Sequence, residues 1–191
     1  MTLTLEKMNR WWESAALLFI AAAIFLRSRF SKRPVLLFVC GSAGSGKSTV
    51  ARIAANLFGN ATPVIEVSSV VGQALGVSDR ASKLRPSYED LVKLEGHLWL
   101  AKRLESAVVA YQSSVAVISG LRELVPYAHL YKQYPSYLIY LDLPAQTRYA
   151  RLKKRDDLAD RKSFNIRQAK EKAVFGKDMA SLKAAATLVI R

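Results

Sequence analysis

Residues 35–54 read VLLFVCGSAGSGKSTVARIA, an apolar run that turns into a glycine-rich loop and then into a stretch with helical spacing. Residues 35–40 are apolar without interruption, which is typical of a strand buried on both faces of a parallel sheet. Residues 47–58 predict a helix that ends near Gly59. The order of these elements predicts a strand–loop–helix unit, and the loop carries the residues that need a chemical explanation.

The loop at residues 41–48, GSAGSGKS, matches the pattern G-x-x-x-x-G-K-[ST] in full. Glycine removes side chains and permits positive φ, so successive N–H groups point inward as a site for an anion at the positive end of the helix. Lys47 would neutralise charge on the β- and γ-phosphates, and the Ser48 hydroxyl would hold Mg²⁺. The sequence predicts a site for ATP and Mg²⁺ formed by Gly41, Ser42, Ala43, Gly44, Ser45, Gly46, Lys47, Ser48 and Thr49.

The chain from residue 34 onward alternates predicted strands and helices. A polar, turn-containing stretch follows the second strand, and Ser87, with Asp90 three residues later, is a plausible N-cap for the next helix. Continuous apolar strands predict a three-layer α/β domain over residues 34–191, with a parallel sheet of about five strands. The further strands are predicted at residues 63–67, 114–118, 137–143 and 187–190, and the further helices at 87–111, 123–132, 145–155 and 164–175.

The charge balance favours an anionic partner. The chain has 29 Lys and Arg against 15 Asp and Glu, which gives a net charge of +14. Such an excess suits phosphorylated small molecules, anionic lipid or nucleic acid. Nucleic acid is the least favoured, because the basic C-terminal third lacks aromatic residues interleaved with basic ones. Cys40 is the single cysteine, which excludes an intrachain disulfide, and two histidines distant in sequence argue against a zinc site.

Residues 1–33 have a different character from the rest of the chain. Residues 14–26 contain no charge and are apolar on every side. A helix of that length covers only about 20 Å, against roughly 30 Å of hydrocarbon in a bilayer. A cleaved signal peptide is disfavoured because no small-residue cleavage site follows, and Glu6 and Glu13 disfavour a transit peptide. The segment is bounded by Trp11 and Trp12 on one side and by Arg27, Arg29, Lys32 and Arg33 on the other.

Two interpretations of this N-terminal hydrophobic helix remain open. The tryptophans and the basic cluster suit a short membrane anchor formed by residues 11–33, with the following domain on the cytoplasmic side. The shortness of the apolar stretch suits a helix packed on the domain itself or on a dimer partner. Residues 1–33 are therefore treated as a separate segment from the domain at 34–191.

Several stretches beyond the loop resemble the P-loop nucleotide kinase superfamily. They are VISGLRE at residues 117–123, YLIYLDLPAQTRYARLKKRDD at 137–157, and the C-terminal stretch at 164–191. The resemblance covers residues 34–191 and is closest to nucleoside monophosphate kinase-like proteins and dephospho-CoA kinases. It implies an ATP-dependent phosphotransferase in which the third strand ends in a Gly-x-Arg turn and the fourth leads into an arginine-rich lid. A helix and a short fifth strand would then close the chain.

The basic helix after the fourth predicted strand is where the resemblance places the lid. Arg148, Arg151 and Arg155 lie at i, i+3 and i+7, so they share one helix face. Guanidinium groups that close on the transferred phosphoryl group would stabilise its charge and exclude water. With Lys47 and Arg122 they are the predicted catalytic residues. A solvated basic helix, balanced by the acidic residues that follow it, is the open alternative.

The acceptor is expected at the carboxyl ends of the strands, where ligands bind in open α/β sheets. Arg122 is the strongest candidate, because an arginine in a Gly-x-Arg turn suits bidentate contact with phosphate, although an ion pair with Glu123 or Asp142 is the alternative. Ser119 and Gly120 stand where many phosphate-loop enzymes carry an aspartate that helps to hold magnesium. The other predicted substrate-binding residues are Glu66, Ser68, Ser69, Arg80 and Arg85.

The predicted function is transfer of a phosphoryl group from ATP to a small nucleotide-type acceptor in the cytoplasm. Dephospho-CoA is the alternative acceptor. A membrane-tethered ATP-binding regulator without small-molecule kinase activity is the alternative of a different class.

Overall fold

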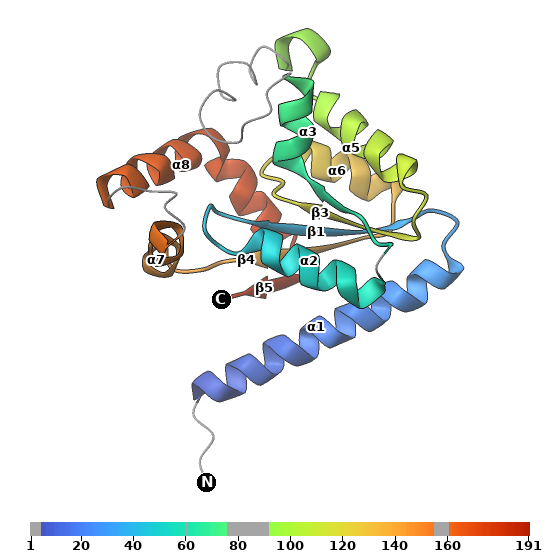
Figure 1. Cartoon of the computed structure of the whole chain (residues 1–191), viewed down its shortest axis with the longest axis horizontal. Coiled ribbons are helices and arrows are strands. Elements are labelled where there is room, and N and C mark those ends of the chain that lie inside the picture. Colours follow the sequence, from blue (N-terminus) through green and yellow to red (C-terminus); the bar gives the residue numbers. More distant parts are fainter. Residues whose placement is uncertain (1–4, 60, 76–91, 155–160) are drawn as a thin grey trace.

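The computed structural model describes residues 5–59, 61–75, 92–154 and 161–191. Its sheet has five strands in the order β2-β3-β1-β4-β5, and every neighbouring pair is parallel (Figure 1). The predicted parallel α/β sheet is thereby confirmed. The strands are β1 (Val35–Gly41), β2 (Val64–Glu66), β3 (Val115–Ser119), β4 (Ser136–Leu141) and β5 (Leu188–Ile190).

Helices cover both faces of this sheet, as Figure 1 shows, with α1 and α2 on one face and α3, α5 and α6 on the other. Alternate residues of β1 enter the two cores: Phe38 packs with α5, α6 and α8, whereas Leu37 packs with α1 and α2. The central strand is thus fully buried. The helices are α1 (Leu5–Phe30), α2 (Lys47–Phe58), α3 (Val67–Ala74), α5 (Trp99–Ala110), α6 (Leu124–Gln133), α7 (Ala145–Lys154) and α8 (Arg161–Ala184).

The predicted helix at residues 87–111 is wrong in its extent. Residues 92–95 form a helical turn, and α5 begins only at Trp99. Gly96 separates them, since it adopts φ +78° and its N–H donates to the Val92 carbonyl, which is how a glycine ends a helix. Ser87 and Asp90, the predicted N-cap pair, lie outside the described residues.

Two other elements differ from the sequence prediction. The stretch after β2, predicted as a polar turn, begins with α3, because Val67 and Val71 lie one turn apart and both are buried. The last helix, predicted over residues 164–175, extends to Ala184 as α8. Met179 and Leu182 are buried, so the apolar contact with the sheet continues well past residue 175.

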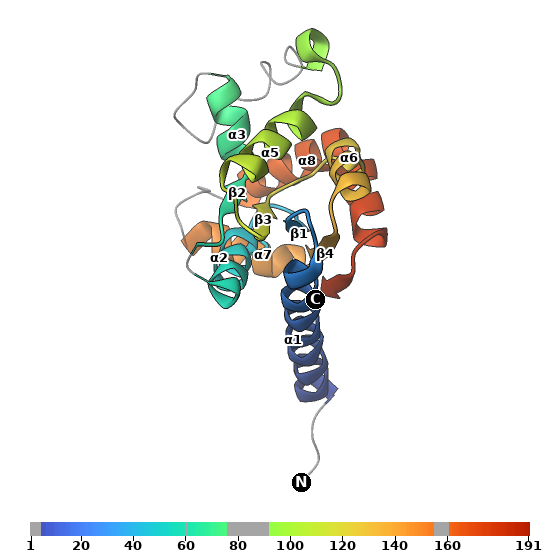
Figure 2. The same cartoon turned by 90° about the vertical axis from the view of Figure 1, so that its right-hand side faces the viewer.

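Helix α1 packs on the domain. Ile20 and Ile24 are buried in the core that α1 shares with α2, β1 and β5. The amino-terminal half of α1 projects beyond the sheet, as Figure 2 shows from the side. Within the described residues, no helix combines the length and apolarity that crossing a bilayer requires. The burial of these side chains agrees with the interpretation of this segment as a helix packed on the domain.

Candidate nucleotide-binding site

The glycine-rich loop joins β1 to α2 at the carboxyl edge of the sheet. Gly46 is the N-cap of α2 at φ +95°, and no side chain caps the helix, so its amino terminus is left open to a ligand. Gly44 adopts φ +79°, and a Cβ there would lie 2.8 Å from the Arg148 carbonyl oxygen. The loop therefore needs glycine both for its conformation and for its close approach to α7.

The Lys47 ammonium folds back over this loop and donates to the Ser42 carbonyl at 2.9 Å. Burial, and after it the charge of Arg122, lowers the pKa of Lys47 to about 8, while the carboxylates of Glu171 and Glu66 oppose the shift. These groups come from α2, β2, α8 and the turn after β3. Lys47 thus lies where charged residues from four parts of the chain converge.

The hydroxyl groups around the loop differ in their exposure. Ser48 and Thr49 are exposed in the first turn of α2, whereas Ser45 is buried. Among the described residues, the Ser45 and Ser119 Oγ atoms are the buried side-chain oxygens or nitrogens with no hydrogen-bond partner. Ser119 ends β3 and Ser45 lies in the loop, so both unsatisfied hydroxyls lie at the carboxyl edge of the sheet, where a polar ligand would satisfy them.

The residues at this site suit a magnesium ion that is bound together with a nucleotide. In the described part of the chain, no three His, Cys, Asp or Glu side chains are grouped to hold a metal. Mg²⁺ commonly takes one or two protein oxygens and completes its shell with phosphate oxygens and water. The exposed Ser48 hydroxyl at the start of α2 suits that role.

The predicted lid arginines of α7 contact the backbone of the loop. Arg148 is buried, and it donates from Nη1 to the Ala43 carbonyl at 3.3 Å and from Nε to the Leu143 carbonyl at 3.2 Å. Arg151 donates from Nη1 to the Ser45 carbonyl at 3.1 Å. The alternative of a solvated basic helix therefore does not hold for Arg148. Arg155 lies outside the described residues.

Arg122 meets α8 in the turn between β3 and α6. Its Nη2 lies 3.4 Å from Oε1 of Glu171, and its guanidinium lies over the Phe175 ring at 5.8 Å from the centroid. Asp142, one of the alternative partners, instead pairs with Lys183 at 2.7 Å. Sequence reasoning did not find Glu171, because an acidic residue between lysines in a basic helix resembles a solvent-exposed one.

The other predicted acceptor residues are distributed around the end of β2. Glu66 ends this strand opposite Ser119 and is half-buried, and its Oε2 lies 4.0 Å from the point where a Cβ of Gly120 would be. Ser68 and Ser69 are exposed in the first turn of α3. The structure thus brings Glu66 and Arg122 toward Lys47, while Arg80 and Arg85 lie outside the described residues.

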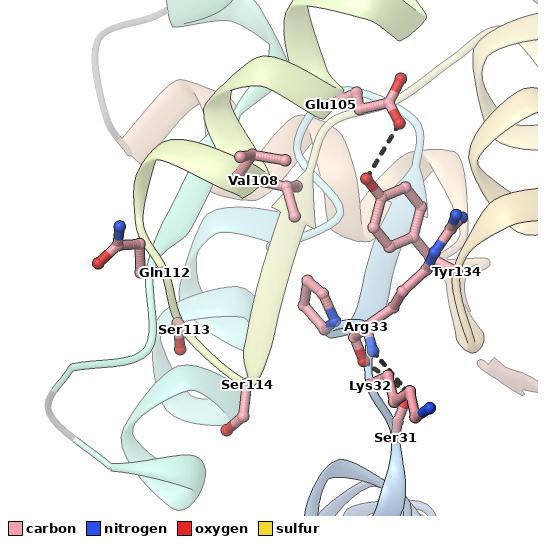
Figure 3. A pocket seen from close by; sticks show the side chains of 11 residues that line it. Ser31, Lys32, Arg33, Glu105, Val108, Gln112, Ser113, Ser114 and Tyr134 are labelled. Carbon is pink, nitrogen blue, oxygen red and sulfur yellow. Dashed lines mark hydrogen bonds between the residues drawn. The ribbon is translucent and has the colours of Figure 1, made fainter.

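A separate cavity of about 520 Å³ lies at the opposite, amino edge of the sheet (Figure 3). Several of its polar side chains bond one another or the backbone. The Tyr134 hydroxyl donates to Glu105 at 3.0 Å, and Arg33 donates to the Gln133 carbonyl at 2.8 Å. None of its lining residues belongs to the glycine-rich loop, so the cavity is distinct from the candidate nucleotide site.

A parallel sheet in this order, with this loop after its central strand, defines the P-loop nucleotide kinase superfamily, as the sequence predicts. A family model described as an AAA domain matches residues 37–173, and the chain belongs to this family. No curated protein matches the sequence.

Two solved structures illustrate proteins that share this fold. A shikimate kinase from Acinetobacter baumannii, in complex with shikimate, aligns with a TM-score of 0.51 at 18% identity over 86% of this chain and 87% of that chain. A shikimate kinase from Bacteroides thetaiotaomicron aligns with a TM-score of 0.51 at 14% identity over 82% and 85% of the two chains. At these identities the likeness establishes the fold.

Proposed function

We propose that the protein is a phosphotransferase that moves the γ-phosphoryl group of ATP to a small acceptor. The observation that carries the proposal is the glycine-rich loop at the open amino terminus of α2, with Lys47 bonded over it and Arg122 joined to it through Glu171. Phosphoryl transfer needs little covalent chemistry from a protein, because positioning and charge stabilisation supply most of the catalysis. The site offers both of these.

In the proposed reaction an acceptor oxygen attacks the γ-phosphorus and the bond to the departing ADP oxygen breaks. Lys47 stabilises the charge that develops on the transferred group, and Mg²⁺ held with Ser48 would neutralise the phosphates. Where the attacking group is a hydroxyl, as in dephospho-CoA or shikimate, Glu66 is the candidate to accept its proton, since the carboxylate is half-buried at the end of β2. An anionic phosphate oxygen of a nucleoside monophosphate would attack without a base. Arg122 would orient the acceptor.

A nucleoside monophosphate is the first candidate acceptor, because an arginine in the turn after β3 suits bidentate contact with a phosphate. Dephospho-CoA is the second. Shikimate is the third candidate acceptor, because two of the fold neighbours are shikimate kinases and one of these was solved with shikimate bound.

The test is a coupled assay of ADP release over nucleoside monophosphates, dephospho-CoA and shikimate, each with ATP and Mg²⁺. We expect one acceptor class to raise ADP release at least about tenfold above the rate with ATP alone. The Lys47→Ala variant should abolish that increase. Acceptor-independent ADP release with every compound, together with tight ATP binding, would contradict the kinase proposal and favour a regulator that binds ATP.

A second proposal concerns location: the outer face of α1 lies on an anionic membrane surface at the cytoplasmic side. Phe19 is 76% exposed and Phe30 is 86% exposed, and Leu18, Phe25 and Leu26 are also exposed on this helix. Basic residues end the helix, and the chain carries a net charge of +14. An apolar helix face with a basic flank binds in the plane of anionic lipid headgroups. The same charge opposes pairing with a second copy.

Vesicle flotation tests this location. We expect the full chain to float with vesicles that contain anionic lipid and to remain unbound with neutral ones. Phe19→Ser should weaken flotation several-fold, and Leu94→Ser, at a position 82% exposed outside α1, serves as the matched control. Equal flotation of the two variants, or an α1-dependent dimer that ignores vesicles, would contradict the proposal.

A further inference from the structure

Glu171 is an acidic side chain buried against the phosphate-binding loop. Its side chain is 5% exposed, although it lies in a helix with lysines at the preceding and following positions. Both of its carboxylate oxygens accept from the Ala43 N–H, at 3.3 and 3.4 Å. A buried carboxylate is costly unless cations and donors compensate for it. Here the compensation comes from the loop and from Arg122, at 3.4 Å.

Helix α8 fixes this carboxylate through three residues on one face. Glu171, Phe175 and Asp178 lie at i, i+4 and i+7, so they point in the same direction. Phe175 supplies the ring under the Arg122 guanidinium, and Asp178 accepts from the Leu124 N–H at 3.0 Å, at the start of α6. This face of α8 therefore contacts Arg122 and the start of α6 through three side chains, and Glu171 also contacts the loop.

We propose that Glu171 is a positioning residue for phosphoryl transfer, which ties the phosphate-binding loop to Arg122 and supplies the negative charge that keeps Lys47 and Arg122 together. The inference rests on the proposed function and deepens it. Two cations converge at the open end of α2, and they repel each other. A fixed carboxylate paired with Arg122 reduces this repulsion and holds the guanidinium in place before ATP arrives.

ATP affinity provides the readout for this role. Glu171 accepts from the Ala43 N–H in the loop and pairs with Arg122. Removing its negative charge would leave Arg122 without this partner and weaken the tie between α8 and the loop. The affinity for ATP–Mg²⁺ should therefore fall, and a shorter carboxylate should restore part of it.

The experiment compares the affinity of wild-type protein and Glu171→Gln for ATP–Mg²⁺ by calorimetry at pH 7. The amide is isosteric and still accepts from Ala43, so the substitution removes the charge and keeps the shape. We expect the affinity to fall about tenfold. Glu95→Gln, at an exposed glutamate paired with Arg103, is the matched control and should leave the affinity unchanged.

Glu171→Asp is the second variant, and it keeps the charge on a shorter side chain. It should bind ATP–Mg²⁺ more tightly than Glu171→Gln does. Unchanged affinity in Glu171→Gln, no recovery in Glu171→Asp, or tighter ATP binding would overturn the positioning role; tighter binding would show that the carboxylate competes with phosphate. Because the readout is ATP affinity, it stands even if no acceptor is phosphorylated, which separates failure of this inference from failure of the kinase proposal.

Discussion

Replacing Lys47 by alanine is expected to weaken binding of ATP–Mg²⁺ by about 10- to 100-fold. The reason is the loss of a charge-assisted hydrogen bond to phosphate, worth about 1.5–3 kcal/mol. Wild-type affinity should also fall as the pH rises through about 8, because burial and Arg122 lower the pKa of Lys47 to that value and the ammonium is charged only below it. Titration calorimetry between pH 6 and pH 9.5 measures both effects.

The control for this prediction is Lys170→Ala, which removes an exposed lysine from α8. It should leave ATP affinity and its pH dependence unchanged. The affinity of Lys47→Ala for ATP–Mg²⁺ should no longer fall as the pH rises through about 8, since the titrating group is gone. If Lys47→Ala bound ATP–Mg²⁺ as tightly as wild-type protein, the loop would not be a triphosphate site.

The second large effect is expected in α1. Ile24 is fully buried, so Ile24→Ala should lower the free energy of unfolding by about 2–5 kcal/mol through lost apolar burial and a residual cavity. Leu18→Ala, at an exposed position of the same helix, should change it by no more than about 0.5 kcal/mol. Urea denaturation followed by circular dichroism measures both. Similar values for the two variants would mean that α1 is not packed on the domain in solution.

The strands of this fold were predictable because each is a continuous apolar run. Burial on both faces leaves that pattern in the sequence, and β1 is apolar from Val35 to Cys40 for this reason. Helix ends were less predictable: the apolar spacing continues through Gly96, and nothing in the spacing signals that this glycine adopts a left-handed conformation. Helix α3 was missed because its buried residues, Val67 and Val71, follow directly from a strand.

The candidate site was predictable in its loop and incomplete elsewhere. A glycine pattern with a lysine is a local signal, and the backbone around Gly44 and Gly46 has the positive φ that the pattern predicts. The contacts of Arg148 with the Ala43 carbonyl and of Glu171 with the Ala43 N–H join residues more than a hundred positions apart. Such contacts depend on how the helices pack, and no spacing within one helix reveals them.

Ala43 is held on both sides, with its carbonyl bonded to α7 and its amide bonded to α8. In the sequence, these two helices directly flank the segment 155–160. A shift of either helix must break a bond to Ala43 or pull the peptide with it. A substitution that loosens either helix would therefore also disturb the glycine-rich loop at Ala43, even though the substituted residue lies far from the loop in the sequence.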